Sequence, residues 1–234
     1  MSIKDIALEF CGRGGKRLRP RLCKAVFEKC GGTGDIGGVC EAIECFHKAS
    51  LIHDDIQDGD EERYGRPTVW KEHGVPVAIA AGDWLVAHGY RLITESGFAA
   101  MPQMIRAAVL SHVRLCEGQG DDLLASSHYQ LPTTNHQLPA ANYQLPTTSY
   151  QLSTYVSICE RKTGEAFALA AQLGALAAEV DDAPFRRYGL AYGILFQIND
   201  DLADGANPAS LAELKREYED KTALYRDECA LGVW

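Results

Sequence analysis

The sequence has no two cysteines in a C-x-x-C arrangement, although it contains eight cysteines. A structural zinc site of the usual spacing is therefore not expected. It also lacks an apolar run long enough to span a membrane, and its N-terminus shows no signal-peptide pattern. Positive charge is scarce, since the formal net charge is −9, which argues against a general nucleic-acid or anionic-membrane surface. We therefore expect a cytoplasmic protein with reduced thiols, no membrane span and no nucleic-acid partner.

Strand signals are weak, whereas helical periodicity fills most of the chain. The 234 residues, of which 46% are hydrophobic, are enough for one sizeable core. Helices are expected over about residues 2–11, 21–31, 38–58, 76–96, 101–126, 153–179, 184–204 and 208–230. A loop is expected at residues 63–68. The sequence thus predicts an all-α fold in a single domain.

A tandem repeat interrupts the helical pattern between about residues 129 and 155. A heptapeptide that begins at Tyr129 recurs with small changes from His136, Tyr143 and Tyr150. Prolines at positions 132, 139 and 146 exclude a coiled coil despite the period of seven. We expect a low-complexity insertion, extended or disordered, between two helices. A partner-binding ribbon is the alternative.

Two aspartate triplets of the form D-D-x-x-D are the main chemical signal. The first is Asp54-Asp55-Ile56-Gln57-Asp58 and the second is Asp200-Asp201-Leu202-Ala203-Asp204, each after an apolar run. Gly59 and Gly205 predict that each helix ends directly after its triplet. Like charges at the negative end of a helix dipole are unfavourable unless a cation binds them. Oxygen ligands favour Mg²⁺, and two solvated acidic helix ends are the alternative.

A glycine-rich turn with four basic side chains precedes the first triplet, in the sequence Gly12-Arg13-Gly14-Gly15-Lys16-Arg17-Leu18-Arg19-Pro20. Backbone N–H groups and cations at a helix start predict a phosphate site, with a solvated basic loop as the alternative. His47, about three turns before Asp58, either faces the same cavity or is an ordinary core or surface histidine. Glycines at 82, 118 and 120 predict close helix packing or a kink.

In their order, these motifs resemble those of the polyprenyl synthetase family, the trans-prenyl diphosphate synthases. The matching motifs are GGKRLRP, HDDIQD with RYGRPT after it, GDWL, GQGDDL, KTG and FQINDDLAD. The resemblance implies an isoprenoid-synthase-type antiparallel helix bundle around a central cavity, assembled as a homodimer. It also implies a Mg²⁺-dependent prenyltransferase. In such an enzyme an allylic prenyl diphosphate ionises, and isopentenyl diphosphate attacks the cation to extend it by one isoprene unit.

The resemblance also assigns roles to individual residues. The Mg²⁺ ligands would be Asp54, Asp55, Asp58, Asp200, Asp201 and Asp204. Isopentenyl diphosphate would be bound by Lys16, Arg19 and His47, and the allylic diphosphate by Arg63 and Lys162. The catalytic set near the cationic carbons would be Lys162, Thr163, Gln197 and Asp122. These roles fit the chemistry, because release of diphosphate needs charge neutralisation and a carbocation needs a site without water.

Two departures from the family pattern keep other functions open. Tyr64 stands where the family has a second arginine, and a neutral phenol cannot clamp phosphate as a guanidinium does. The chain begins close to the glycine-rich turn and ends soon after the second triplet, so we expect a short version of the fold. The alternatives are a degenerate non-catalytic subunit and a terpene cyclase-like enzyme that does not elongate its substrate.

The resemblance also implies that bulky side chains upstream of the first triplet limit the length of the product. Ala49 and Ser50 are small, and the first large group is Phe46, roughly 12 Å before Asp54 along a helix axis. We therefore expect a product near geranylgeranyl diphosphate.

Overall fold

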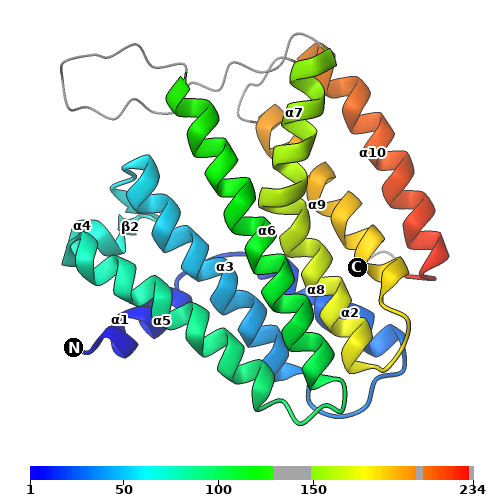
Figure 1. The fold of residues 1–234 in the computed structure, drawn as a ribbon, viewed down its shortest axis with the longest axis horizontal. Coiled ribbons are helices and arrows are strands. Elements are labelled where there is room, and N and C mark those ends of the chain that lie inside the picture. The colour runs from blue at the N-terminus through cyan, green and yellow to red at the C-terminus, as the bar shows by residue number, and fades with distance from the viewer. Residues whose placement is uncertain (129–148, 204–207, 232–234) are drawn as a thin grey trace. The chain divides into compact units, whose positions relative to one another are not determined.

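The computed structural model describes residues 1–128, 149–203 and 208–231. Helices make up most of this part of the chain, and the two strands found in it form one short hairpin (Figure 1). The predicted all-α class is confirmed. None of the described helices is both long and apolar enough to cross a membrane.

The described residues divide into two compact units, and each is treated by itself. The first consists of Met1–Arg21 and Asp35–Gly97, and the second contains the remaining described residues. The single domain expected from the sequence stays a prediction.

The first unit is built on two long helices and a short hairpin. Its elements are α1 (Ile3–Cys11), the first turn of α2 (Leu18–Lys29), α3 (Gly37–Asp58), β1 (Glu62–Arg63), β2 (Arg66–Pro67), α4 (Val69–His73) and α5 (Val75–Thr94). The loop expected at residues 63–68 is wrong in part, because the strands pair there around a two-residue turn and α4 follows. Helix α1 begins with a capping box, in which Ser2 Oγ accepts from Asp5 N at 3.2 Å and Asp5 Oδ2 accepts from Ser2 N at 2.8 Å.

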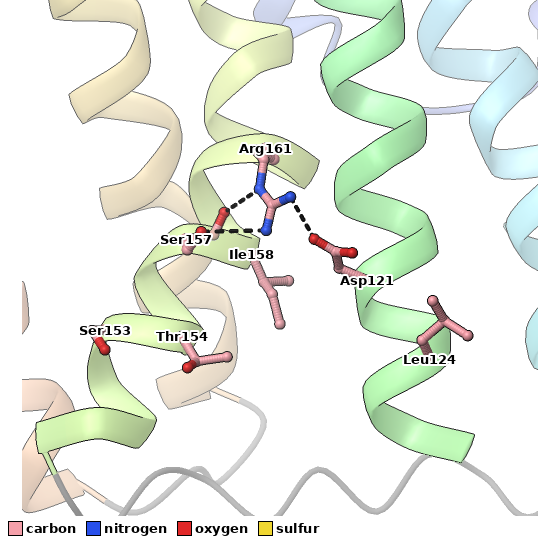
Figure 2. A pocket seen from close by; sticks show the side chains of 7 residues that line it. All are labelled: Asp121, Leu124, Ser153, Thr154, Ser157, Ile158 and Arg161. Carbon is pink, nitrogen blue, oxygen red and sulfur yellow. Dashed lines mark hydrogen bonds and ion pairs between the residues drawn. The ribbon is translucent and has the colours of Figure 1, made fainter. Parts of the chain in front are cut away.

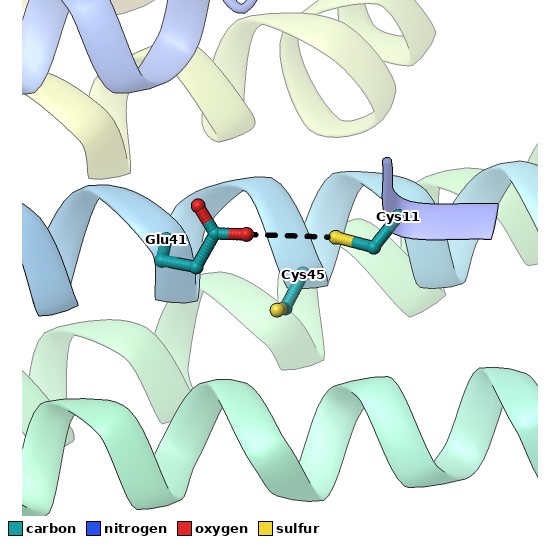
Figure 3. A group of neighbouring side chains, drawn as sticks. All are labelled: Cys11, Glu41 and Cys45. Atoms are coloured by element: carbon teal, nitrogen blue, oxygen red, sulfur yellow. Dashed lines mark hydrogen bonds between the residues drawn. The ribbon is translucent and has the colours of Figure 1, made fainter. Parts of the chain in front are cut away.

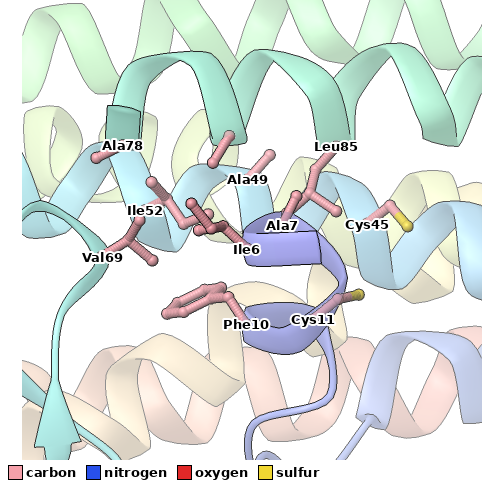
Figure 4. Close-up of a cluster of buried hydrophobic side chains, with 11 residues drawn as sticks. Ile6, Ala7, Phe10, Cys11, Cys45, Ala49, Ile52, Val69, Ala78 and Leu85 are labelled. Atoms are coloured by element: carbon pink, nitrogen blue, oxygen red, sulfur yellow. The ribbon is translucent and has the colours of Figure 1, made fainter. Parts of the chain in front are cut away.

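Helices α3 and α5 pack closely because glycines of α5 receive large side chains of α3. A Cβ on Gly82 would lie 2.2 Å from His53 Nε2, and a Cβ on Gly89 would lie 2.6 Å from Phe46 Cε1. The two glycines are seven residues apart on α5, and their partners are seven residues apart on α3 in the reverse order. The two helices are therefore antiparallel. The close-packing prediction for Gly82 is confirmed. Helix α1 completes this core, with Phe10 fully buried between the other apolar side chains (Figure 4).

The second unit contains the rest of α2 and the C-terminal helices. These are α6 (Met101–His128), α7 (Ser149–Cys159), the π-helical turn η1 (Glu160–Gly164), α8 (Glu165–Ala177), α9 (Ala183–Ala203) and α10 (Pro208–Glu228). The segment expected as one helix over 153–179 therefore contains a π turn, which the sequence pattern did not indicate. Glycines again permit close packing, since a Cβ on Gly193 would lie 2.7 Å from Gly164 Cα. Similarly, a Cβ on Gly118 would lie 2.7 Å from Arg161 Cβ, which confirms that this glycine marks close packing.

The fourth copy of the heptapeptide repeat is helical. Residues 129–148, which contain the first three copies, lie outside the described residues. The copy that begins at Tyr150 belongs to α7, so an extended conformation is wrong for it. The physical reason is its composition: Ser153 occupies the position where the earlier copies have proline, which would break a helix.

Candidate active site

The first aspartate triplet forms the last turn of α3. This helix ends where predicted, because Gly59 adopts a left-handed φ of 73° and its N–H donates to Asp55 O. The three carboxylates differ in exposure: Asp54 is half-buried, Asp55 is buried and Asp58 is exposed. Burial raises the pKa of Asp55, and the adjacent Arg63 partly offsets that rise.

Arg63 of the hairpin binds the middle carboxylate of this triplet. Its Nε lies 2.5 Å from Asp55 Oδ1, and its NH2 lies 3.6 Å from Asp60 Oδ2. The second carboxylate oxygen, Asp55 Oδ2, is buried and accepts no hydrogen bond. A buried acceptor without a donor is costly, so this oxygen fits a cation ligand. The hairpin thus brings the predicted allylic-diphosphate residue directly to the predicted metal ligands.

The four basic side chains of the glycine-rich turn have different roles. Arg13 is buried and structural: its Nε donates to Glu9 Oε2 and its NH1 to Pro67 O, both at 2.8 Å. Arg17 NH2 pairs with Glu41 Oε2 at 2.6 Å. Lys16 is exposed and forms no ion pair within the described residues. The other two, Lys16 and Arg19, are the residues assigned to the diphosphate of isopentenyl diphosphate, and that role stays a prediction.

Arg19 and His47 lie in a positively charged environment with Lys48 and Arg63. Burial lowers the pKa of Arg19 to about 10, although the Glu44 carboxylate acts in the opposite direction. Burial also lowers the pKa of His47 well below its usual value, and the charges of Arg19, Lys48 and Arg63 add to the effect. A neutral imidazole beside these cations can donate one N–H to a phosphate oxygen. The first unit thus brings together Arg19, His47 and Arg63.

A further group of possible metal ligands lies in the core of the same unit. Cys11 Sγ, Cys45 Sγ and a carboxylate oxygen of Glu41 all lie within 4.8 Å of one another (Figure 3). Cys11 Sγ donates to Glu41 Oε1 at 3.8 Å, which leaves the other oxygen to Arg17. A hydrogen bond between the two thiols lowers the pKa of Cys11 and raises that of Cys45. Because the guanidinium already neutralises Glu41, we interpret the cysteines as buried thiols of the apolar cluster.

In the second unit, the π turn presents Lys162 and Thr163 to neighbouring helices. Lys162 Nζ donates to Asp122 Oδ2 of α6 at 2.6 Å, and Thr163 Oγ1 donates to Gln197 Oε1 of α9 at 2.8 Å. The backbone contact between Gly164 and Gly193 explains this reach, because Gln197 lies one turn after Gly193. All four predicted catalytic residues are therefore held by hydrogen bonds to one another in two pairs. Single-turn π-helices are frequent at functional sites.

In the second aspartate triplet, the middle carboxylate accepts hydrogen bonds from neutral donors. Gln197 Nε2 donates to Asp201 Oδ1 at 2.8 Å, and the Tyr155 hydroxyl of α7 donates to Asp201 Oδ2. Burial, the thiol of Cys159 and the Asp201 carboxylate raise the pKa of Tyr155, so it remains a donor. Asp200 is exposed. Asp204 and the expected cap Gly205 lie outside the described residues, so the third ligand stays a prediction.

A cavity of about 440 Å³ lies between α6 and α7 of the second unit (Figure 2). Arg161 crosses it, donating to Ser157 O and Ser157 Oγ at 3.3 Å and pairing with Asp121. None of the predicted site residues lines it, and we assign it no substrate.

Sequence reasoning missed three side chains that support these sites. Tyr155 binds Asp201, and Lys48 is fully buried beneath the glycine-rich turn. Glu165, also buried, accepts from Ser111 Oγ and Arg114 on α6 and from Arg186 NH2 on α9, the last at 2.6 Å. The one available signal was a charged residue inside an otherwise apolar helical face, as at Lys48 and Glu165.

A comparison with known sequences agrees with the family that the order of the motifs suggested. A sequence model of the polyprenyl synthetases matches residues 2–221. The chain belongs to the polyprenyl synthetase family. It is 35% identical over 196 residues to a short chain isoprenyl diphosphate synthase of Methanothermobacter thermautotrophicus, covering 82% of this chain and 54% of that relative. It is also 35% identical over 196 residues to a geranylgeranyl diphosphate synthase of Mycobacterium tuberculosis, covering 82% of this chain and 51% of that one. The chain thus spans about half the length of these curated relatives.

The fold agrees with the family. A polyprenyl synthase from Caulobacter crescentus, described as complexed with calcium and isoprenyl diphosphate, superposes with a TM-score of 0.71 at 29% identity. The match covers 89% of this chain and 58% of that one. The predicted isoprenoid-synthase-type fold is therefore confirmed, and use of a divalent metal is typical of the family.

Proposed function

We propose that this protein condenses isopentenyl diphosphate with an allylic prenyl diphosphate and releases diphosphate. One observation carries the proposal: Asp55, with its buried unpaired oxygen, lies against Arg63 in the same unit that holds Arg19 and His47. A metal–diphosphate complex requires carboxylates to bind the metal and basic side chains to bind the diphosphate, and this unit contains both.

The chain's own residues divide the work. Mg²⁺ supplies charge neutralisation of the leaving diphosphate when it is bound, with ligands from Asp54, Asp55, Asp58 and the second triplet (Asp200, Asp201 and Asp204). Arg63 and Lys162 bind the allylic diphosphate, for which each must exchange its present carboxylate partner. Lys16, Arg19 and His47 bind isopentenyl diphosphate.

The allylic cation is stabilised by oxygen dipoles of the second unit. Thr163 and Gln197 are fixed to each other by a hydrogen bond of 2.8 Å, so their oxygens need little reorganisation as charge develops. Asp122 accompanies Lys162 near the same carbons. Assembly as a homodimer and a cytoplasmic location belong to the same proposal.

The test is incubation of the purified protein with radiolabelled isopentenyl diphosphate, Mg²⁺ and each allylic primer in turn. We expect an elongated prenyl diphosphate as the product, and addition of EDTA should abolish its formation. A cyclised hydrocarbon would instead identify a terpene cyclase-like enzyme. Absence of any product from every primer would identify a degenerate subunit.

The product is proposed to be geranylgeranyl diphosphate or one near it in length. Phe46 packs against Gly89 and contacts the Tyr90 ring at a tilt of 59°, with ring centroids 5.0 Å apart. Replacing Phe46 with alanine removes the first bulky group upstream of Asp54 and should lengthen the product by about one isoprene unit, roughly one helical turn. Chromatography of the dephosphorylated products measures this. An unchanged distribution would show that another group limits the chain length.

A further inference from the structure

Tyr64, the residue that departs from the family pattern, adopts a backbone conformation that is unfavourable for tyrosine. It forms the two-residue turn of the hairpin with Gly65, and both have positive φ, 56° and 71°. Such turns favour glycine, asparagine and aspartate. A strained conformation persists where surrounding contacts determine it, and it often marks a functional position.

The contacts that hold Tyr64 are made with the glycine-rich turn and with Lys48 of α3. The Lys48 ammonium lies 4.5 Å from the centre of the Tyr64 ring, within cation–π distance. The ring lies so close to Gly14 that a Cβ there would be 2.9 Å from ring atoms. The absence of a side chain at Gly14 therefore allows the ring to pack against the turn.

Lys48 holds the turn from the other side. Its side chain is fully buried, and Nζ donates to Arg13 O and, at 3.1 Å, to Gly14 O. Because a trans peptide directs its C=O and N–H in opposite directions, the N–H groups of Gly14 and Gly15 point away from Lys48. Within the described residues neither N–H donates a hydrogen bond. Successive N–H groups in a turn can form an anion-binding concavity, and the exposed Lys16 follows directly.

We propose that Lys48 and Tyr64 are paired positioning residues that take the place of the family's second arginine. They hold the turn of residues 12–19 in the shape that binds the diphosphate of isopentenyl diphosphate, an inference that rests on the proposed function. An arginine at position 64 is incompatible with Lys48, because it would place a guanidinium beside a buried ammonium. Lysine at 48 and tyrosine at 64 therefore belong together.

Kinetic constants of single variants give the first test. Lys48→Met should raise the KM for isopentenyl diphosphate about tenfold or more, the value of a charged hydrogen bond. Tyr64→Leu should raise it about fivefold, and Tyr64→Phe, which keeps the ring face, should restore it to within about twofold. The KM for the allylic primer should stay constant in all three variants. Lys71→Met is the matched control, because Lys71 lies 5.9 Å from the Trp70 ring and away from the turn.

A double variant gives the decisive test. Tyr64→Arg alone should raise the KM for isopentenyl diphosphate about tenfold, whereas Tyr64→Arg with Lys48→Met should return it to within about threefold of the parent. Additive effects in the double variant, or an unchanged KM in every variant, would overturn the proposal. The proposal would also fail if kcat decreased and both KM values increased by similar factors as the melting temperature fell. Such changes indicate a merely structural role. Tyr64 is 44% exposed, so its variants keep the test available if Lys48→Met does not fold.

Calorimetric titration with inorganic pyrophosphate separates this inference from the proposed function. The Kd values should follow the same order as the KM values. If the Kd values of the parent and its variants for pyrophosphate follow this order but the parent makes no product, the proposed function fails and the positioning role stands. If the parent elongates its primer and all variants bind equally, the positioning role alone fails.

Discussion

The two aspartate triplets have the same sequence pattern, but their middle carboxylates are held in different ways. In the first unit Asp55 pairs with a guanidinium, Arg63, at 2.5 Å. In the second unit Asp201 accepts hydrogen bonds from two neutral donors, Tyr155 and Gln197. The charged partner of Asp55 offsets its charge at Oδ1, whereas Oδ2 has no donor. Neutral donors orient the carboxylate and leave its charge available. The same motif therefore places its middle carboxylate beside a cation in one unit and between neutral donors in the other.

The largest expected effect comes from removing one outer ligand of either triplet. Asp54→Ala and Asp200→Ala should each lower kcat by about 10³-fold, because the leaving diphosphate loses part of its charge neutralisation. Product formation at saturating substrate measures this, with Asp220→Ala on the exposed face of α10 as the control. A normal rate in either variant would show that its triplet does not bind the catalytic metal.

A buried carboxylate outside the triplets tests whether a guanidinium partner stabilises the fold. Glu165, whose side chain is 3% exposed, pairs with Arg186 at 2.6 Å. Arg186→Met should lower the free energy of unfolding by about 2–4 kcal/mol, because one buried carboxylate oxygen loses its donor. The neighbouring Arg187 pairs with Glu228 on the surface at 3.2 Å, so Arg187→Met should cost less than about 1 kcal/mol. Urea denaturation compares the two, and equal losses would contradict the prediction.

Tyr155→Phe tests the neutral support of the second triplet. Loss of the hydroxyl that orients Asp201 should raise the Mg²⁺ concentration for half-maximal activity about tenfold. Tyr218, in the same hydrophobic cluster, provides the control Tyr218→Phe, which should leave the Mg²⁺ requirement unchanged. An equal Mg²⁺ requirement in parent and Tyr155→Phe would show that this hydrogen bond has no part in metal binding.

The smallest expected effect concerns His47 and pH. Because the pKa of His47 is lowered in the folded protein, the unfolded chain takes up the proton first as the pH falls below about 6.5. The free energy of unfolding should therefore decrease between pH 7.5 and 5.5, with His47 contributing at most about 1.3 kcal/mol. His47→Gln should remove this contribution, as measured by urea denaturation at both pH values. The same pH dependence in parent and variant would mean that folding does not lower the pKa of His47.

Much of the fold follows from local patterns in the sequence. Apolar periodicity indicates the long helices, and Gly59 ends α3 because its left-handed φ suits glycine. Proline distinguishes the repeat, and its replacement by Ser153 explains why the fourth copy joins a helix. The short strands at Arg63 and Arg66 and the π turn at Lys162 were not predicted, because neither changes the hydrophobic pattern on which such predictions depend.

By itself the sequence determined the helical class, the family and the residues proposed to bind metal and diphosphate, because these depend on spacing along the chain. Only the tertiary structure decided the partner of each side chain: Arg63 for Asp55, Tyr155 for Asp201, and Lys48 beneath Gly14. A hydrogen bond depends on distances between atoms that can be many residues apart, and helical periodicity contains no information about those distances. The structure therefore adds that Lys48 and Tyr64 contact each other and the turn that is proposed to bind diphosphate, whereas the sequence marked Tyr64 only as a departure from the family pattern.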